Sequence, residues 1–356
     1  MPDEEEETIV DNLGDEDQDI SATYSITSYG TDYPVDALVT RMRSGDIVVP
    51  PFQRGYVWTY RQACRFIESL LLGLPVPGIF LSKEEETQKL LIIDGHQRLR
   101  TLQDFYDGVF TKTDEGFKLS GLRSRFDGLR YNSLPEEDRR RLDDSILHAT
   151  IVRQDEPEDE GSSIYLIFER LNTGGTDLAG QEIRAAVYRG EFSTLLKELN
   201  AVTAWREIFG RVSNRMRDQE LILRFLGLHV YWRQYESPMK EFLNRVTARN
   251  KHLQVHSAEE VKSAFIPTVK LIREALGIAA FRPQGVLNAA VFDSVMVGVS
   301  TRLAEGPISD QGQLAEAYKR LLESKEYMEA TERATAREEP LKKRIGLAID
   351  AFRGVK

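Results

Sequence analysis

A cluster of polar residues suited to a phosphate group follows a short apolar segment near residue 94. Residues 90–93 are all apolar, as in a strand that is buried on both faces. Leu99 and Leu102 then begin the spacing of an amphipathic helix. We therefore expect a strand-to-helix turn to carry the residues Asp94-Gly95-His96-Gln97-Arg98.

This turn has the chemistry of an anion site. A helix N-terminus presents unpaired backbone N–H groups and the positive end of the helix dipole. Gly95 would let the backbone approach a ligand closely, and the five-donor guanidinium of Arg98 suits a phosphate. Asp94, at the strand end, could hold a metal ion or orient a water molecule. The alternative is an ordinary Asp-Gly turn that only caps a helix.

Two further segments carry residues of the same kind. Gln53 and Arg54 lie among aromatic residues, directly after the apolar residues 47–49. Farther along the chain, Asn172-Thr173-Gly174-Gly175 supplies a glycine turn before a helix. That turn is either a plain connection between helices or a loop whose backbone amides and Asn172 close over a ligand.

The elements around these clusters follow from the hydrophobic spacing. Residues 79–82 and 89–93 predict a hairpin whose second strand delivers Asp94, and the fold predicted from the whole pattern is α+β. We expect further strands at residues 23–27, 47–49 and 146–152, and helices at residues 34–42, 60–74, 164–171, 221–235, 261–276 and 286–299 and after Pro135.

The formal charge of -10 is concentrated at the N-terminal end. Residues 1–19 hold ten acidic residues and no lysine or arginine, so the rest of the chain is neutral. We expect residues 1–22 to be a disordered, solvating tail, with competition against DNA for a basic groove as the alternative. A neutral body neither supports nor excludes nucleic-acid binding.

Several kinds of chemistry find no support in the sequence. A single cysteine, Cys64, excludes an internal disulfide framework and a cysteine-based zinc site, and its helical spacing predicts burial. His148 and His229 are expected to be structural, while His252 and His256 lack a third metal ligand. No apolar run is long enough for a membrane span and no signal peptide is recognised, so we expect a cytoplasmic protein.

Three motifs occur in the order and spacing of a known family. They are Pro-x-Phe-Gln-Arg-Gly-Tyr-Val-Trp at residues 50–58, Ile-Asp-Gly-His-Gln-Arg-Leu at residues 93–99, and Phe-Glu-Arg-Leu-Asn-Thr-Gly-Gly-Thr-Asp-Leu at residues 168–178. In these residues the chain resembles the N-terminal domain of GmrSD-type modification-dependent restriction endonucleases, which has the ParB/sulfiredoxin-like fold. His96 stands where the family usually has glutamine; both side chains donate and accept hydrogen bonds.

The resemblance implies nucleotide binding, with hydrolysis as the activity, and a nucleoside triphosphate and a divalent metal, magnesium, as cofactors. It implies a ParB/sulfiredoxin-like domain at residues 23–155, followed by a mainly helical domain at residues 156–356. Catalysis is assigned to Asp94, His96 and Gln97, and metal binding to Asp94. Nucleotide and phosphate binding are assigned to Gln53, Arg54, Gly95, Arg98, Asn172, Thr173 and Gly174.

Biologically, the resemblance implies a sensor or switch in DNA restriction or anti-phage defence. No constellation for a His-Asn-His-type nuclease domain follows Arg189, so cleavage is expected from a separate nuclease or another defence subunit. Expected partners are the nucleotide, DNA, such a subunit and a second copy of the chain, but no membrane. The alternatives are a DNA-binding module without turnover and a metal-dependent nuclease at Asp94, for which one carboxylate is a poor site.

Overall fold

The computed structural model describes residues 9–11, 25–49, 56–84, 86–156, 162–171, 178–332 and 334–356. The chain divides into two compact units. The first, here called the sheet unit, comprises Tyr24–Glu158 and Ser163–Asp177. The second, here called the helical unit, comprises Met1–Thr23, Asp159–Ser162 and Leu178–Lys356. A mixed sheet in one unit and helices in the other confirm the α+β prediction.

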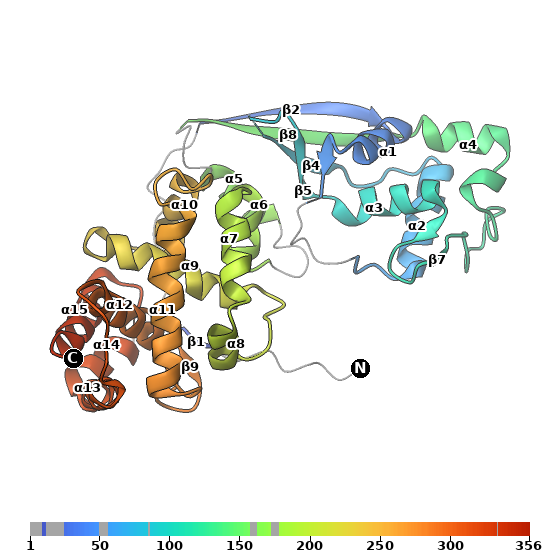
Figure 1. Ribbon diagram of the computed structural model, residues 1–356. Coiled ribbons are helices and arrows are strands. Elements are labelled where there is room, and N and C mark those ends of the chain that lie inside the picture. Colours follow the sequence, from blue (N-terminus) through green and yellow to red (C-terminus); the bar gives the residue numbers. More distant parts are fainter. Residues whose placement is uncertain are drawn as a thin grey trace. The chain divides into compact units, whose positions relative to one another are not determined.

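The sheet unit is built on a five-stranded mixed sheet in the order β2-β8-β4-β5-β3 (Figure 1). The neighbouring strands β4 and β5 form the predicted antiparallel hairpin, while β4 runs parallel to β8 and β3 parallel to β5. The strands are β2 (Ser25–Pro34), β3 (Ile47–Val48), β4 (Ile79–Lys83), β5 (Leu90–Asp94) and β8 (Ile146–Glu156), with a small separate pair β6 (Val109–Phe110) and β7 (Glu115–Gly116).

Helices of the sheet unit share one apolar core with the sheet. Buried side chains of α1, α2 and α3 meet Ile79, Leu81 and Ile92 of the hairpin in that core. Cys64 belongs to it and is fully buried, as its helical spacing predicted. The helices are α1 (Val35–Ser44), α2 (Tyr60–Leu71), α3 (His96–Asp107), the 3₁₀ turn η1 (Tyr131–Ser133), α4 (Glu136–Asp143) and α5 (Ser162–Leu171).

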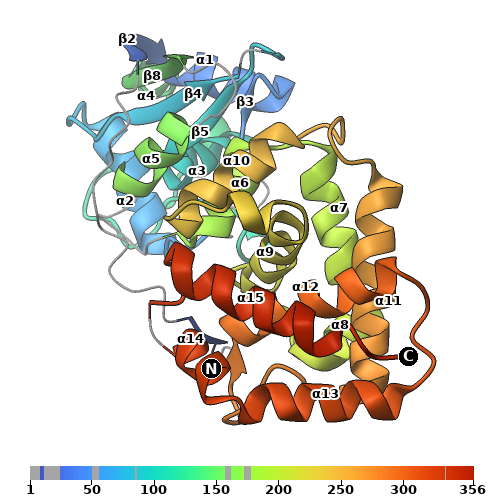
Figure 2. The same ribbon diagram turned by 90° about the vertical axis from the view of Figure 1, so that its left-hand side faces the viewer.

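In the helical unit, the other helices pack around two largely buried helices, α9 and α12. Residues 289–300 of α12 are buried without interruption, and α12 packs against α9 and α15 (Figure 2). The elements are α6 (Gly180–Val187), α7 (Glu191–Asn200), α8 (Thr203–Phe209), α9 (Arg217–Tyr231), η3 (Trp232–Gln234), α10 (Met239–Arg249), α11 (Ala258–Leu276), β9 (Leu287–Asn288), α12 (Ala289–Ala304), α13 (Gln311–Glu323), α14 (Lys325–Glu332) and α15 (Glu338–Phe352).

The acidic N-terminal segment differs in part from the expected disordered tail. Ile9 and Val10 form strand β1 (Ile9–Val10), which pairs in parallel with β9 of the helical unit. Asp11 follows and its Oδ2 lies 2.7 Å from Nη1 of Arg224, a side chain that is fully buried in α9. The segment is held because Ile9 and Val10 pair with β9 and the carboxylate of Asp11 pairs with the buried guanidinium of Arg224. Net acidity alone could not reveal either partner.

Arg224 belongs to a buried ionic cluster at the centre of the helical unit. Its Nη2 lies 2.6 Å from Oδ2 of Asp293 in α12, and the same oxygen lies 3.2 Å from Nη2 of Arg344 in α15. Asp293 therefore serves two arginines, and Asp11 supplies the second negative charge. Because a buried unpaired charge is costly, the cluster ties α9, α12 and α15 to the N-terminal segment.

Strand β2 is longer than the pattern predicted. Residues 23–27 read as a short strand, yet β2 pairs antiparallel with β8 along the whole of Ser25–Pro34. The sequence signal is weak because β2 lies at the sheet edge and exposes most of its side chains, and Gly30 and Asp32 disfavour a strand. A Cβ at Gly30 would lie 2.8 Å from Cε1 of the exposed His148 side chain, so a larger residue there would require this ring to move.

Candidate functional site

The turn between β5 and α3 is where the sequence placed its main polar cluster. Gly95 has φ of +98°, and a Cβ at this position would lie 2.3 Å from Cγ2 of Ile79. Both the backbone conformation and the close packing therefore require glycine. Gly95 caps α3 without a side-chain hydrogen bond. Among the described residues, the first N–H groups of α3 consequently have no side-chain acceptor and lie where an anion would be stabilised.

Asp94 and Arg98 face each other across this turn. Oδ2 of Asp94 lies 2.7 Å from Nη2 of Arg98, and the same Nη2 donates to the carbonyl oxygen of Gly78 at 3.0 Å. The Asp94 side chain is 45% exposed, whereas that of Arg98 is 14% exposed. Nε of Arg98 is buried and has no hydrogen-bond partner. Arg98 thus stabilises the turn through its Nη2, while its Nε–H near the helix N-terminus remains without an acceptor.

His96 is the first residue of α3 and is partly buried. Burial, assisted by the nearby charge of Arg100, lowers the pKa of His96 to about 4. The imidazole is therefore neutral near pH 7, and it makes no hydrogen bond to the residues that the structure describes. A neutral ring of this kind donates through one nitrogen and accepts through the other, but brings no positive charge to a phosphate.

Gln97 links the turn to the first Gln/Arg cluster. Its Oε1 accepts hydrogen bonds from the backbone N–H groups of Val57, at 3.0 Å, and Trp58, at 3.2 Å. One turn later, Thr101 donates to the carbonyl oxygen of Gln97 and lies 2.5 Å from the hydroxyl oxygen of Tyr56. Residues 56–58 are therefore docked on α3. Gln53 and Arg54, just before them, lie outside the described residues.

This arrangement joins two of the three sequence motifs, and comparison with protein families gives it a context. Residues 35–189 match the family model described as GmrSD restriction endonuclease, N-terminal domain. The chain contains a GmrSD-type N-terminal domain. This domain type indicates a role in a restriction system, with DNA or a nuclease as the kind of partner. No curated protein matches the chain.

The third motif of the GmrSD-type domain is followed by α6, in which Glu182 and Arg184 are buried in ion pairs. Nη1 of Arg184 lies 2.8 Å from Oε2 of Glu220, and Nε of Arg215 lies 3.1 Å from Oε2 of Glu182. Arg184 also donates to Oδ1 of Asn244 at 3.0 Å. These residues hold the helical unit together, a role that the sequence did not assign. Asn172, Thr173 and Gly174, which were assigned to ligand binding, lie outside the described residues.

Few side chains at the β5–α3 turn could bind a metal ion. Within the described parts of the chain, no group of three or more histidine, cysteine or acidic side chains is arranged so that it could hold a metal ion. Asp94 is the carboxylate at the turn, and one of its oxygens already faces Arg98. Magnesium is commonly held by one or two carboxylates together with substrate phosphates and water, so Asp94 fits as a single protein ligand.

His148 and Cys64 have the structural environments that the sequence predicted. His148 is in β8, with its Nδ1 2.8 Å from Oδ1 of Asp32. Burial raises the pKa of the Cys64 thiol, which makes it a poor nucleophile. In the described residues, no helix combines the length and apolar character that crossing a membrane requires.

Proposed function

We propose that the GmrSD-type domain binds a nucleoside triphosphate at the β5–α3 turn and hydrolyses it. The observation that carries the proposal is the turn itself, where glycine is obligatory and the N-terminus of α3 has no side-chain cap. Such an N-terminus binds anionic oxygens through backbone N–H groups and the helix dipole. A phosphate placed there would be beside the guanidinium of Arg98.

Binding of a phosphate at the turn would change the pairing of Asp94 and Arg98. In the structure, the carboxylate of Asp94 pairs with the guanidinium of Arg98. A phosphate oxygen would compete for the same donors, because charge-assisted hydrogen bonds to guanidinium are strong for both anions. Release of Asp94 would leave a half-exposed carboxylate close to the phosphates, free to orient a water molecule or bind a cation.

A divalent cation, when bound by Asp94 and the phosphates, would neutralise negative charge on the transferred phosphoryl group. His96 contributes as a neutral hydrogen-bonding ring, which suits a water molecule or a nucleobase edge better than a phosphate. Gln97 holds the segment of Val57 and Trp58 against α3. Gln53, Arg54, Asn172, Thr173 and Gly174 complete the proposed set of ligand contacts.

In a restriction system, nucleotide binding and hydrolysis would switch the domain between two states. A role in a restriction system calls for a state that changes when foreign DNA is met. Nucleotide binding and hydrolysis would supply two such states, with DNA cleavage carried out by a nuclease partner.

A thermal-shift panel of nucleoside di- and triphosphates, with and without magnesium, tests the binding step. A ligand that binds only the folded chain stabilises it by about 2.7 kcal/mol at one hundred times its Kd. We expect at least one triphosphate to raise the melting temperature more in the presence of magnesium. If no nucleotide does so, while duplex DNA binds with a steep dependence on salt, the domain is a DNA-binding module instead.

A further inference from the structure

Strand β2 leaves one edge of the five-stranded sheet open. Among the described residues it pairs with β8 alone, along the whole of Ser25–Pro34 (Figure 1). Residues 26–30 are exposed without interruption. Since successive side chains of a strand point to opposite faces, both faces of this stretch are uncovered. Its large side chains, Ile26 and Tyr29, are 39% and 44% exposed. An open edge of this kind is a template for a further strand.

The first residues of β2 also lack support from the rest of the sheet. Strand β4 pairs with β8 as far as Val152. Beyond this point the described part of β8 pairs with β2 alone, so that Ile26 and Thr27 face Gln154 and Arg153 in a two-stranded ribbon. A two-stranded ribbon is marginally stable in water, whereas three or more strands stabilise one another. A further strand beside β2 would therefore stabilise this end of the sheet.

The register shows which backbone groups of β2 face the open edge. The N–H of Val35 donates to the carbonyl oxygen of Ser145 at 3.0 Å, and the pairing with β8 keeps this register from Pro34 to Ile26. In an antiparallel pair, residues that exchange hydrogen bonds alternate with residues that do not. Odd-numbered residues of β2 therefore bond to β8, whereas the N–H and C=O groups of the even-numbered residues 26–32 point to the open edge. Proline, which has no N–H, stands at an even-numbered position, as this assignment requires.

The edge carries few of the features that keep edge strands from pairing. Such features are lysine, proline and β-bulges. Residues 26–33 contain no lysine or proline, and the register shift lies at the very start, between Ser25 and Ile26. Asp32 is the single charged residue of this stretch, and its Oδ1 lies 2.8 Å from Nδ1 of His148 in the same chain. The edge is therefore close to neutral and built mainly from residues that favour strands.

We propose that β2 pairs antiparallel with β2 of a second copy of the chain, about a twofold axis at Tyr29. The outward backbone groups then bond to one another, Ser28 with Gly30 and Ile26 with Asp32 of the second copy. Tyr29 faces the same residue of the second copy in a non-hydrogen-bonded pair, where side chains are closest.

The charges of the strand favour an identical partner. In this register the two Asp32 side chains lie six residues, about 20 Å, apart along the joined strands, so they do not oppose each other. A nearly neutral edge has no need of a partner of opposite charge, and its outward groups are complementary to themselves. The interface does not include the β5–α3 turn, so it stands whether or not that turn binds nucleotide.

A cysteine at Tyr29 tests the twofold axis in the full-length chain. The Cα atoms of a non-hydrogen-bonded pair are about 4.5 Å apart, within the range that a disulfide spans. The single native cysteine, Cys64, is fully buried, so Tyr29→Cys has one exposed thiol. With oxidised glutathione we expect Tyr29→Cys to form a covalent dimer on a non-reducing denaturing gel. Leu74→Cys, at a similarly exposed residue after α2, should stay monomeric and serves as the control.

Thr27 and Thr31 test the register. Thr27 of one copy faces Thr31 of the other across the proposed axis, and each is far from its own counterpart. Thr27→Cys alone and Thr31→Cys alone should therefore form little covalent dimer, whereas an equal mixture of the two should cross-link.

Ser28→Pro tests the pairing without a cross-link. Proline removes an N–H that points to the open edge and leaves the bonds to β8 in place, while Ser28→Ala keeps this N–H and is the control. In analytical ultracentrifugation, the parent and Ser28→Ala should show a concentration-dependent dimer, and Ser28→Pro should dimerise about tenfold more weakly or less.

Two results would overturn the proposal. The first is a parent chain that stays monomeric at every concentration, together with no more cross-linking in Tyr29→Cys than in Leu74→Cys. The second is a folded Ser28→Pro chain that dimerises as tightly as the parent, which would place the interface away from β2.

Discussion

Oε1 of Gln97 accepts a hydrogen bond of 3.0 Å from the backbone N–H of Val57, 40 residues earlier in the chain. Because the N–H of Trp58 donates to the same oxygen, one side chain holds the end of the first motif on the first turn of α3. The sequence assigned Gln97 to catalysis. Its contacts make it a positioning residue in this structure, and a direct part in the reaction stays a prediction.

Replacing Gln97 should separate these two roles. Gln97→Leu removes the acceptor of two N–H groups and should lower the free energy of unfolding by about 1–2 kcal/mol. Gln97→Glu keeps an acceptor oxygen at a helix N-terminus and should remain close to the parent in stability. Chemical denaturation measures both. Equal stability of the leucine variant and the parent would mean that the segment docks without Gln97.

Arg98→Ala should reduce nucleotide affinity and also cost some stability. The lost charge-assisted contact should weaken binding by about 1.5–3 kcal/mol, and loss of the hydrogen bond to Gly78 should lower stability by about 1 kcal/mol. Arg43→Ala removes a half-exposed arginine that pairs with Asp107 and serves as the control. Equilibrium binding decides the matter, and an Arg98→Ala chain that binds nucleotides as well as the parent would remove Arg98 from the site.

His96 should make folding stability depend on pH. Its pKa is about 4 in the folded chain, against an ordinary value of 6.5, so between these values the unfolded chain binds more protons. Stability from this group is complete above pH 6.5 and declines as the pH falls toward 4, by up to about 3 kcal/mol. In His96→Gln, denaturation curves across this range should show a smaller decline. His229, whose pKa is also lowered, accounts for part of the slope that remains.

Asp11→Asn should destabilise the chain although the residue belongs to the acidic N-terminal segment. The substitution leaves the buried Arg224 and Arg344 with Asp293 as their remaining acidic partner, and breaking a buried pair costs about 3–5 kcal/mol. Asp350→Asn breaks an exposed pair with Arg353 and should cost less than about 1 kcal/mol. Thermal or chemical denaturation compares the two. Equal stabilities would show that the charge of Asp11 is not needed to hold the cluster.

The elements that position the site were predictable because their signals are local. The β4–β5 hairpin, the start of α3 after Gly95 and the burial of Cys64 follow from apolar spacing and turn residues. The same holds for α4 after Pro135 and for α11 and α12, apart from their ends.

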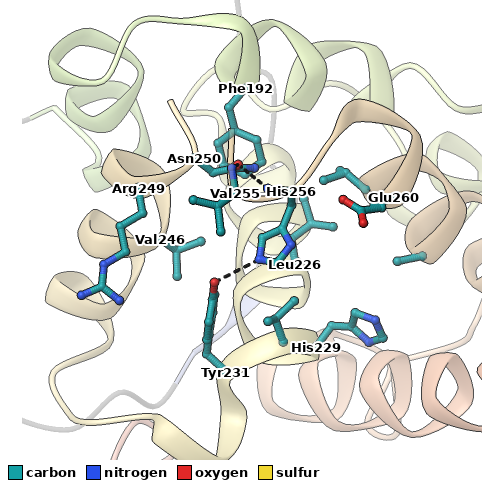
Figure 3. A pocket seen from close by; sticks show the side chains of 13 residues that line it. Phe192, Leu226, His229, Tyr231, Val246, Arg249, Asn250, Val255, His256 and Glu260 are labelled. Atoms are coloured by element: carbon teal, nitrogen blue, oxygen red, sulfur yellow. Dashed lines mark hydrogen bonds between the residues drawn. The ribbon is translucent and has the colours of Figure 1, made fainter. Parts of the chain in front are cut away.

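What the sequence did not reveal depends on partners far apart in the chain. Strand β2 exists along its full length because β8 pairs with it, and β1 because β9 does. Arg184 lies within the family match of residues 35–189, yet its contacts with Glu220 and Asn244 are structural. His229 and His256 were expected to be structural or unused, and only the folded chain shows the pocket between α7, α9, α10 and α11 that both line (Figure 3).

The central claim is that the β5–α3 turn binds and hydrolyses a nucleoside triphosphate, and Asp94→Asn tests it most directly. Asparagine keeps the size and one acceptor oxygen of Asp94 but loses the charge that faces Arg98. Binding and phosphate release should be measured on the same preparation, beside the parent chain. We predict that triphosphate affinity is kept or rises, while phosphate release falls by about a hundredfold or more. Phosphate release at the parent rate would contradict the account and reduce Asp94 to a residue of its turn.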